Sequence, residues 1–172
     1  MFMETLGRRQ TLSLVIQITR EQIKTNMTEL FRPNAPYLTV DCVLFDEDAV
    51  VLIRRGHPPF QGYYALPGGF VDVGETTEHA CAREVLEETG IQIPPENLQL
   101  IGVYSDPLRD PNRHTVSIGY FSEYDGQKLN AGDDAEAVEI ISNWNSIEIA
   151  FDHKKIIKDA WKLRGNSKRG MP

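Results

Sequence analysis

The segment formed by residues 69–91 constrains this chain most, because a glycine-rich start runs into an acidic stretch with helical spacing. It reads GFVDVGETTEHACAREVLEETGI. The stretch predicts a helix over about residues 76–89, with Gly90 as its C-terminal cap. One side of this helix carries the residues that we expect to face a core: Ala82, Val85, Leu86 and Thr89.

The other side of the predicted helix gathers three carboxylates. At about 100° per residue, Glu84, Glu87 and Glu88 fall within a sector of about 100°. Like charges at this spacing repel one another, so the cluster is hard to justify by stability alone. Carboxylate oxygens suit Mg²⁺, whereas Zn²⁺ prefers His or Cys ligands. The cluster therefore predicts a magnesium site, with Mn²⁺ as the alternative ion.

Composition agrees with a metal-mediated contact to a negatively charged substrate. The formal net charge is −7 at pH 7, which argues against a nucleic-acid partner. The two cysteines, Cys42 and Cys81, form no CxxC pair, so we expect two reduced, buried thiols in a cytoplasmic protein. No apolar run is long enough to cross a bilayer, and we expect no membrane partner.

Apolar and β-branched runs separated by turn residues predict strands on both sides of the acidic helix. These runs are residues 37–45, 49–55, 63–71, 98–106, 114–124 and 137–144. Helical spacing returns over residues 149–164, so the order of elements predicts an α+β architecture. We expect an N-terminal extension of uncertain structure over residues 1–35, one domain over residues 36–164, and a polar tail over residues 165–172.

A family resemblance rests on the same segment. Gly69, Glu75 and the run REVLEETGI over residues 83–91 resemble the Nudix box, with every defining position filled. The resemblance implies an α/β/α sandwich around a mixed β-sheet and a metal-dependent hydrolase that cleaves a nucleoside diphosphate linked to another group. It also implies roles for individual residues. The implied metal ligands are the Gly69 carbonyl, Glu84, Glu87 and Glu88. Arg83 would orient the glutamates, and Glu75 would support either the loop–helix junction or a metal-bound water.

The resemblance leaves the general base open. Some members of the family use a glutamate of the box, and others use an acidic residue on a later loop. This chain offers Asp133, Asp134 and Glu136 in the turn GDDAE. The same turn could be a solvated hairpin tip, since Gly and Asp are favoured turn residues.

The sequence outside the box is similar to that of one subgroup of the family, the ADP-ribose pyrophosphatases. Pro107 stands sixteen residues after Ile91, a spacing that resembles a marker of this subgroup, and the resemblance covers about residues 37–163. It suggests that basic and aromatic side chains bind the phosphates, the ribose or the adenine: Arg54, Arg55, Phe60, Tyr64, Arg109, Arg113 and His114. Taken singly, each of these arginines could be solvated and each aromatic could belong to the core.

The predicted reaction is therefore the hydrolysis of ADP-ribose to AMP and ribose 5-phosphate. The alternative is a Nudix hydrolase that acts on nucleoside triphosphates or other nucleoside diphosphate derivatives. A third hypothesis is a non-catalytic ADP-ribose sensor, although such proteins usually carry an added DNA-binding domain and a damaged box. Because enzymes of this subgroup are often dimers, the resemblance also implies a homodimer.

Overall fold

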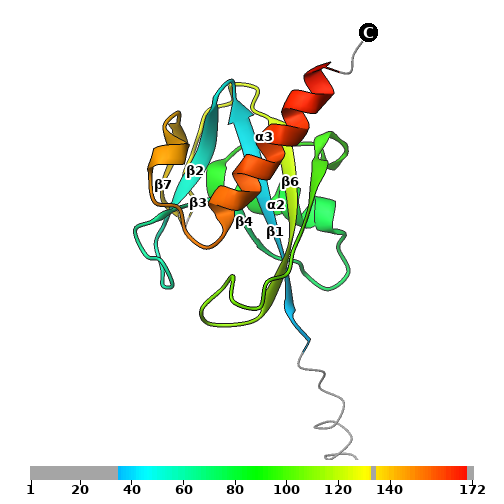
Figure 1. Ribbon diagram of the computed structural model, residues 1–172, viewed down its shortest axis with the longest axis vertical. Coiled ribbons are helices and arrows are strands. Elements are labelled where there is room, and N and C mark those ends of the chain that lie inside the picture. The colour runs from blue at the N-terminus through cyan, green and yellow to red at the C-terminus, as the bar shows by residue number, and fades with distance from the viewer. Residues whose placement is uncertain (1–34, 133–134, 170–172) are drawn as a thin grey trace, which may run out of the picture. The chain divides into compact units, whose positions relative to one another are not determined.

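A mixed sheet organised around strand β1 (Tyr37–Asp46) forms the middle of the domain (Figure 1). The computed structural model describes residues 35–132 and 135–169, so the expectations for residues 1–34 lie outside the described part. The other strands are β2 (Ala49–Arg55), β3 (Tyr64–Ala65), β4 (Gly68–Phe70), β5 (Gln99–Tyr104), β6 (Thr115–Glu123) and β7 (Ala135–Ile141). The helices are α2 (Thr77–Thr89), α3 (His153–Arg169) and the short 3₁₀ turns η1 (Pro95–Asn97) and η2 (Trp144–Ser146).

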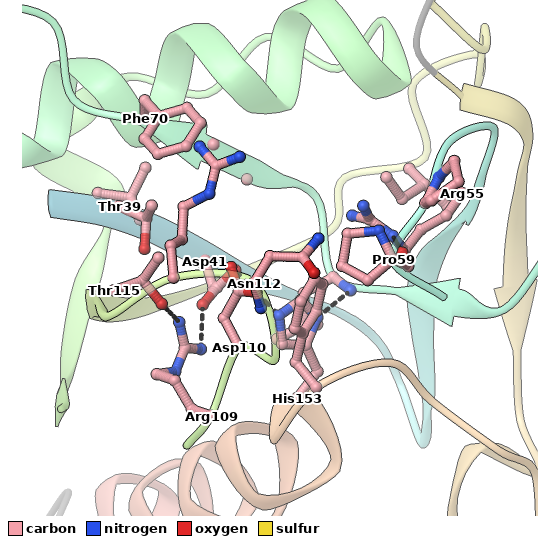
Figure 2. Close-up of a pocket in the computed structure, with 18 residues that line it drawn as sticks. Thr39, Asp41, Arg55, Pro59, Phe70, Arg109, Asp110, Asn112, Thr115 and His153 are labelled. Carbon is pink, nitrogen blue, oxygen red and sulfur yellow. Dashed lines mark hydrogen bonds and ion pairs between the residues drawn. The ribbon is translucent and has the colours of Figure 1, made fainter. Parts of the chain in front are cut away.

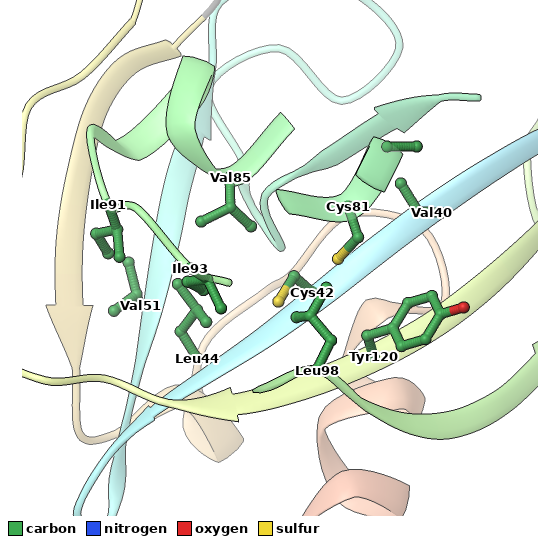
Figure 3. Close-up of a cluster of buried hydrophobic side chains, with 11 residues drawn as sticks. Val40, Cys42, Leu44, Val51, Cys81, Val85, Ile91, Ile93, Leu98 and Tyr120 are labelled. Atoms are coloured by element: carbon green, nitrogen blue, oxygen red, sulfur yellow. The ribbon is translucent and has the colours of Figure 1, made fainter. Parts of the chain in front are cut away.

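Strand β1 is covered on both faces, which explains its nearly continuous apolar sequence. On one face Val40, Cys42 and Leu44 pack with residues of α2 (Figure 3). On the other face Val43 and Phe45 pack with residues of α3. Figure 1 shows α3 crossing the near side of the sheet and α2 behind it. The predicted α+β class, an α/β/α sandwich around a mixed sheet, is confirmed.

The sheet splits beside β1, and this split positions the site. Strand β1 runs parallel to β6 along its length, but it pairs with β2 only at Leu44, Phe45 and Asp46. Nearer the start of β1, at Thr39–Asp41, the strand that pairs with it on the same side is β4. Between the two pairings, the Cys42 amide donates to the Pro67 carbonyl over 2.9 Å. Strands β1 and β2 therefore diverge around the loop that begins the box.

The predicted strands are all present, with small shifts at their ends. The run over residues 63–71 forms two short strands, β3 and β4, instead of one. Helix α3 is longer than expected, because five residues assigned to the polar tail, 165–169, continue it. The reading of the GDDAE turn as a hairpin tip is wrong: β7 pairs with β2, not with β6, so the chain crosses from one part of the sheet to another.

Both cysteines are buried free thiols, as expected, and Figure 3 shows Cys81 of α2 close to Cys42 of β1. Among the helices of the described residues, none combines the length and apolar character needed to span a membrane.

Candidate metal-dependent active site

Helix α2 holds the acidic residues of the site in a fixed rotation. The Thr76 side chain caps its start by accepting from the His79 amide, and Gly90 ends it with φ of 74°, as the sequence predicted. Val85 and Thr89 are fully buried against the sheet. Leu86 does not join them: it is 48% exposed, because the buried side of the helix is rotated away from it, toward Cys81.

Arg83 binds most of the acidic residues of the box. Its guanidinium donates to Glu75 over 2.8 Å, to Glu84 over 2.8 Å and to Glu87 over 3.2 Å. It also donates to the carbonyl oxygen of Phe70 over 2.9 Å, which ties the helix to the end of β4. The bond from Arg83 lowers the pKa of Glu75. Arg83 therefore orients these carboxylates and neutralises part of their charge.

The Glu84 carboxyl packs directly on the backbone of Gly69. A Cβ atom at position 69 would lie 2.5 Å from this carboxyl group, so a larger residue would displace the Glu84 side chain from this contact. The Glu84 side chain is only 14% exposed, and burial raises its pKa. The contact therefore places a carboxyl oxygen of Glu84 next to the peptide group of Gly69.

Glu88 is the most strongly perturbed acid of the site. Burial, together with the nearby charge of Glu84, raises its pKa to about 8 from an ordinary value of 4.5. Its carboxyl oxygen accepts from the Gly68 amide over 2.9 Å, which partly offsets the shift. Gly68 itself has φ of 157° and approaches the Val40 carbonyl so closely that a Cβ would lie 2.1 Å from that oxygen. Gly68 therefore packs between β1 and the Glu88 carboxyl group.

The donor set fits a hard divalent cation. Glu84, Glu87, Glu88 and the Gly69 carbonyl offer oxygen ligands, and a positive ion would relieve the resistance of the buried carboxyls to ionisation. In the described residues no three Asp, Glu, His or Cys side chains are already arranged to hold a metal. Arg83 bonds one oxygen of Glu84 and one of Glu87, so metal binding would require the box carboxylates to move closer together.

A cavity of about 290 Å³ opens next to this loop, where β1 and β2 diverge (Figure 2). Gly69 belongs both to its wall and to the Glu84 contact, so the acidic cluster and the cavity share one piece of backbone. The predicted substrate residues on the wall are Arg55, Arg109 and Arg113. Arg113 lies with its guanidinium carbon 5.7 Å from the ring centre of Phe70, a wall residue that the sequence analysis missed.

Other predicted substrate residues are engaged elsewhere. Arg54 donates to the Tyr64 hydroxyl over 2.8 Å, and that hydroxyl donates to Glu139 over 3.1 Å. Phe60 packs edge-on against Phe151 at 4.9 Å and lines a neighbouring cavity. The structure does not bring these three side chains to the wall shared with Gly69.

His114 is exposed, and its carbonyl accepts from the Tyr37 amide over 3.0 Å. Arg109 lies on the cavity wall but is almost completely buried and paired with Asp41 and Asp152. Asp41 and His153, also on the wall, were missed by the sequence analysis. A polar residue inside the apolar run of β1 was the available signal for Asp41.

The connection before β7 packs against the end of α2 through residues that precede the candidates for the general base. The Gly132 amide donates to the Glu88 carbonyl over 3.3 Å, and the Asn130 amide to the Thr89 carbonyl over 2.8 Å. Glu136 is exposed on β7, next to the bulge where β7 meets Arg55. Asp133 and Asp134 lie outside the described residues.

An acid-bearing helix and a glycine loop on an α/β/α sandwich define the class of the protein. The model of the NUDIX domain matches residues 35–164. The chain belongs to the Nudix family, as the resemblance of the box predicted.

Particular relatives agree with this assignment. The chain is 46% identical over 129 residues to the ADP-ribose pyrophosphatase of Methanocaldococcus jannaschii, covering 74% of this chain and 75% of that protein. It is 30% identical to the ADPR responsive transcriptional repressor NtrR of Acinetobacter baylyi, over 92% of this chain and 66% of the repressor. Among solved structures, the NUDIX domain of Shewanella oneidensis NrtR complexed with ADP ribose matches with a TM-score of 0.69 and 28% identity, covering 75% of this chain and 88% of that one.

Proposed function

We propose that the protein hydrolyses the pyrophosphate bond of ADP-ribose, giving AMP and ribose 5-phosphate, with Mg²⁺ as the metal and Mn²⁺ as an alternative. The observation that carries the proposal is the shared position of Gly69, which lines the cavity while its backbone contacts the Glu84 carboxyl. The similarity to the archaeal ADP-ribose pyrophosphatase supports the choice of substrate.

The box residues would hold the cation: Glu84, Glu87, Glu88 and the carbonyl of Gly69. When bound, the metal supplies charge neutralisation for the diphosphate and a water that loses its proton more easily. Arg83 keeps the glutamates oriented through its bonds to Glu75 and to the Phe70 carbonyl. A diphosphate bound in the cavity would then lie next to the Gly69 backbone that contacts Glu84.

Arg55 is the best placed of the predicted phosphate-binding residues. Its Nε donates to the Pro59 carbonyl over 2.9 Å, and its guanidinium carbon lies 4.9 Å from the ring centre of Phe151. These contacts fix the side chain while it still lines the cavity. Its charge also interacts favourably with Glu88, so Arg55 stands between the acidic cluster and the wall. We assign it to the diphosphate.

Arg113 and Phe70 would receive the base of the nucleotide. The guanidinium already lies over an aromatic ring, and a planar base could add to this stack. Phe60 and Tyr64 are less suited to this role, because the Phe60 ring packs on Phe151 and the Tyr64 ring lies under the Arg54 guanidinium.

The general base is either a glutamate of the box or one of Asp133, Asp134 and Glu136. Glu136 follows a connection that is fixed to the end of α2 by the Gly132 and Asn130 amides. Gly132, four residues before Glu136, therefore lies beside the last turn of the box helix.

A side-by-side assay of ADP-ribose, dGTP, NADH and Ap4A, with product identification in ¹⁸O-water, tests the proposal. We expect the highest kcat/KM for ADP-ribose, with AMP and ribose 5-phosphate as products. A preference for a nucleoside triphosphate by about tenfold would contradict it and favour the alternative substrate class.

A non-catalytic sensor is the second candidate, because the chain also resembles the repressor NtrR of Acinetobacter baylyi. The complete set of box residues argues for catalysis. Binding of ADP-ribose without AMP release in the presence of Mg²⁺ would favour the sensor.

We also infer a cytoplasmic homodimer. The two buried free thiols agree with a reducing compartment. The mass of the protein in solution tests the dimer, and a monomeric mass at micromolar concentration would contradict it.

A further inference from the structure

The loop between β5 and β6, residues 105–114, forms one side of the cavity while being largely exposed. It contributes Asp110, Asn112 and Arg113 to the wall. Leu108 on the same loop is 88% exposed. Arg109, by contrast, is only 9% exposed, so its buried side chain anchors the loop to the domain.

Every nitrogen of the Arg109 guanidinium donates to a protein acceptor. Nη2 donates to Asp152 over 2.7 Å and to Asp41 over 3.1 Å, and Nε donates to Asp152 over 3.1 Å. Nη1 donates to the Thr115 hydroxyl over 3.3 Å, and Figure 2 shows the bonds to Thr115 and Asp41. These acceptors come from β1, β6 and the start of α3, so one side chain joins the loop to three elements.

The network continues from Asp41 to the loop that begins the box. Asp41 accepts from the Ser117 hydroxyl and lies 3.3 Å from Nε2 of His153. The Leu66 amide donates to Nδ1 of His153 over 2.9 Å, so Nδ1 is an acceptor and Nε2, which faces Asp41, carries the proton. Leu66 precedes Gly68 and Gly69 of β4 by two and three residues. The loop and the Gly69 wall of the cavity are therefore connected through buried contacts.

We propose that Arg109 is a positioning residue that holds the loop 105–114, and with it Arg113, at a fixed distance from the Gly69 wall. This inference rests on the proposed function, because the distance matters for a ligand that contacts both walls. Arg109 itself does not bind the substrate, since its donors are already engaged. Loss of the anchor weakens ligand binding but leaves the acidic cluster unchanged, so KM rises while kcat stays nearly constant.

Two variants test the anchor. Arg109→Lys keeps the positive charge but loses the planar group that reaches Asp152, Asp41 and Thr115 together. Asp152→Asn leaves the Arg109–Asp41 pair intact and removes one charge of the network, so it tests the proposal even if the lysine variant does not fold.

The matched control is Arg164→Lys. Arg164 is 8% exposed and pairs with Glu123 and the Glu47 carbonyl. Thr115 lies beside Tyr37 and Glu123 beside Phe45 in the parallel β1–β6 pair, so the control removes a similar contact at the opposite end of the sheet.

The first measurement is hydrogen exchange of the amides in residues 105–114, without substrate. We expect exchange about tenfold faster in Arg109→Lys and Asp152→Asn, and no change there in Arg164→Lys. The second is steady-state hydrolysis of ADP-ribose, in which KM should rise about tenfold and kcat change less than about twofold. Unchanged loop exchange, equal loosening in the control, or a fall in kcat at constant KM would overturn the inference. If the unmodified protein does not cleave ADP-ribose, the proposed function fails, and the exchange data alone then decide on the anchor.

Discussion

The buried carboxyl of Glu88 should make the metal-free protein less stable as the pH rises. Its pKa in the folded protein is about 8, against an ordinary value of 4.5, because burial disfavours the charged form. A folded-state pKa above the unfolded one means that the folded protein holds the proton more tightly. The resulting stability is complete below pH 4.5 and is lost as the pH rises through 8.

The size of the effect follows from the two pKa values. Between roughly pH 6 and pH 9 the unfolded chain has already lost the proton, while the folded protein loses it only near pH 8. Two pH units at about 1.4 kcal/mol each give a loss of about 3 kcal/mol in the free energy of unfolding.

Denaturant unfolding in EDTA measures this loss, with Glu88→Gln as the reference. Glutamine keeps an acceptor for the Gly68 amide but does not titrate. Other titrating groups affect both proteins, so the difference between their unfolding free energies isolates Glu88. We expect this difference to change by about 3 kcal/mol across the range. A constant difference would refute the argument that burial controls this carboxyl.

Three further results are expected. Millimolar Mg²⁺ should raise the Tm by about 5 °C and EDTA should reverse the change, because the ion binds the folded site only; an unchanged Tm would count against the site. Gly69→Ala should weaken Mn²⁺ binding about tenfold in calorimetry, since the new Cβ meets the Glu84 carboxyl, and unaltered affinity would contradict this contact. Replacing Asp133, Asp134 and Glu136 singly by the amide should find one variant that keeps metal binding but loses turnover; full activity in all three would place the base in the box.

Local patterns predicted much of the fold. The acidic helix, its Gly90 cap and the strands could be read from the sequence because each depends on neighbouring residues. Leu86 shows the limit of this reasoning: helical spacing shows that a helix has an apolar side, but which of its residues are buried depends on the strands below the helix. Long-range pairing has the same limit, since the partner of β7 cannot be inferred from its own sequence.

The site was predictable where the residues lie within one motif. Arg83 bonds Glu75, Glu84 and Glu87, in line with the orienting role that the family resemblance implied, whereas Glu88 bonds the Gly68 amide instead. Arg109 was expected to contact substrate, but its acceptors Asp41 and Asp152 lie 68 and 43 residues away in the sequence. An arginine on an exposed loop looks the same in a sequence whether it meets a ligand or a distant carboxylate.

The most direct test of the account is turnover of ADP-ribose by Glu88→Gln with saturating Mg²⁺. If buried carboxylates on α2 gather the metal that breaks the pyrophosphate bond, kcat should fall by at least about a hundredfold while the circular dichroism spectrum stays unchanged. A variant that releases AMP as fast as the unmodified protein would contradict the account, because the chemistry would then not depend on this acidic cluster.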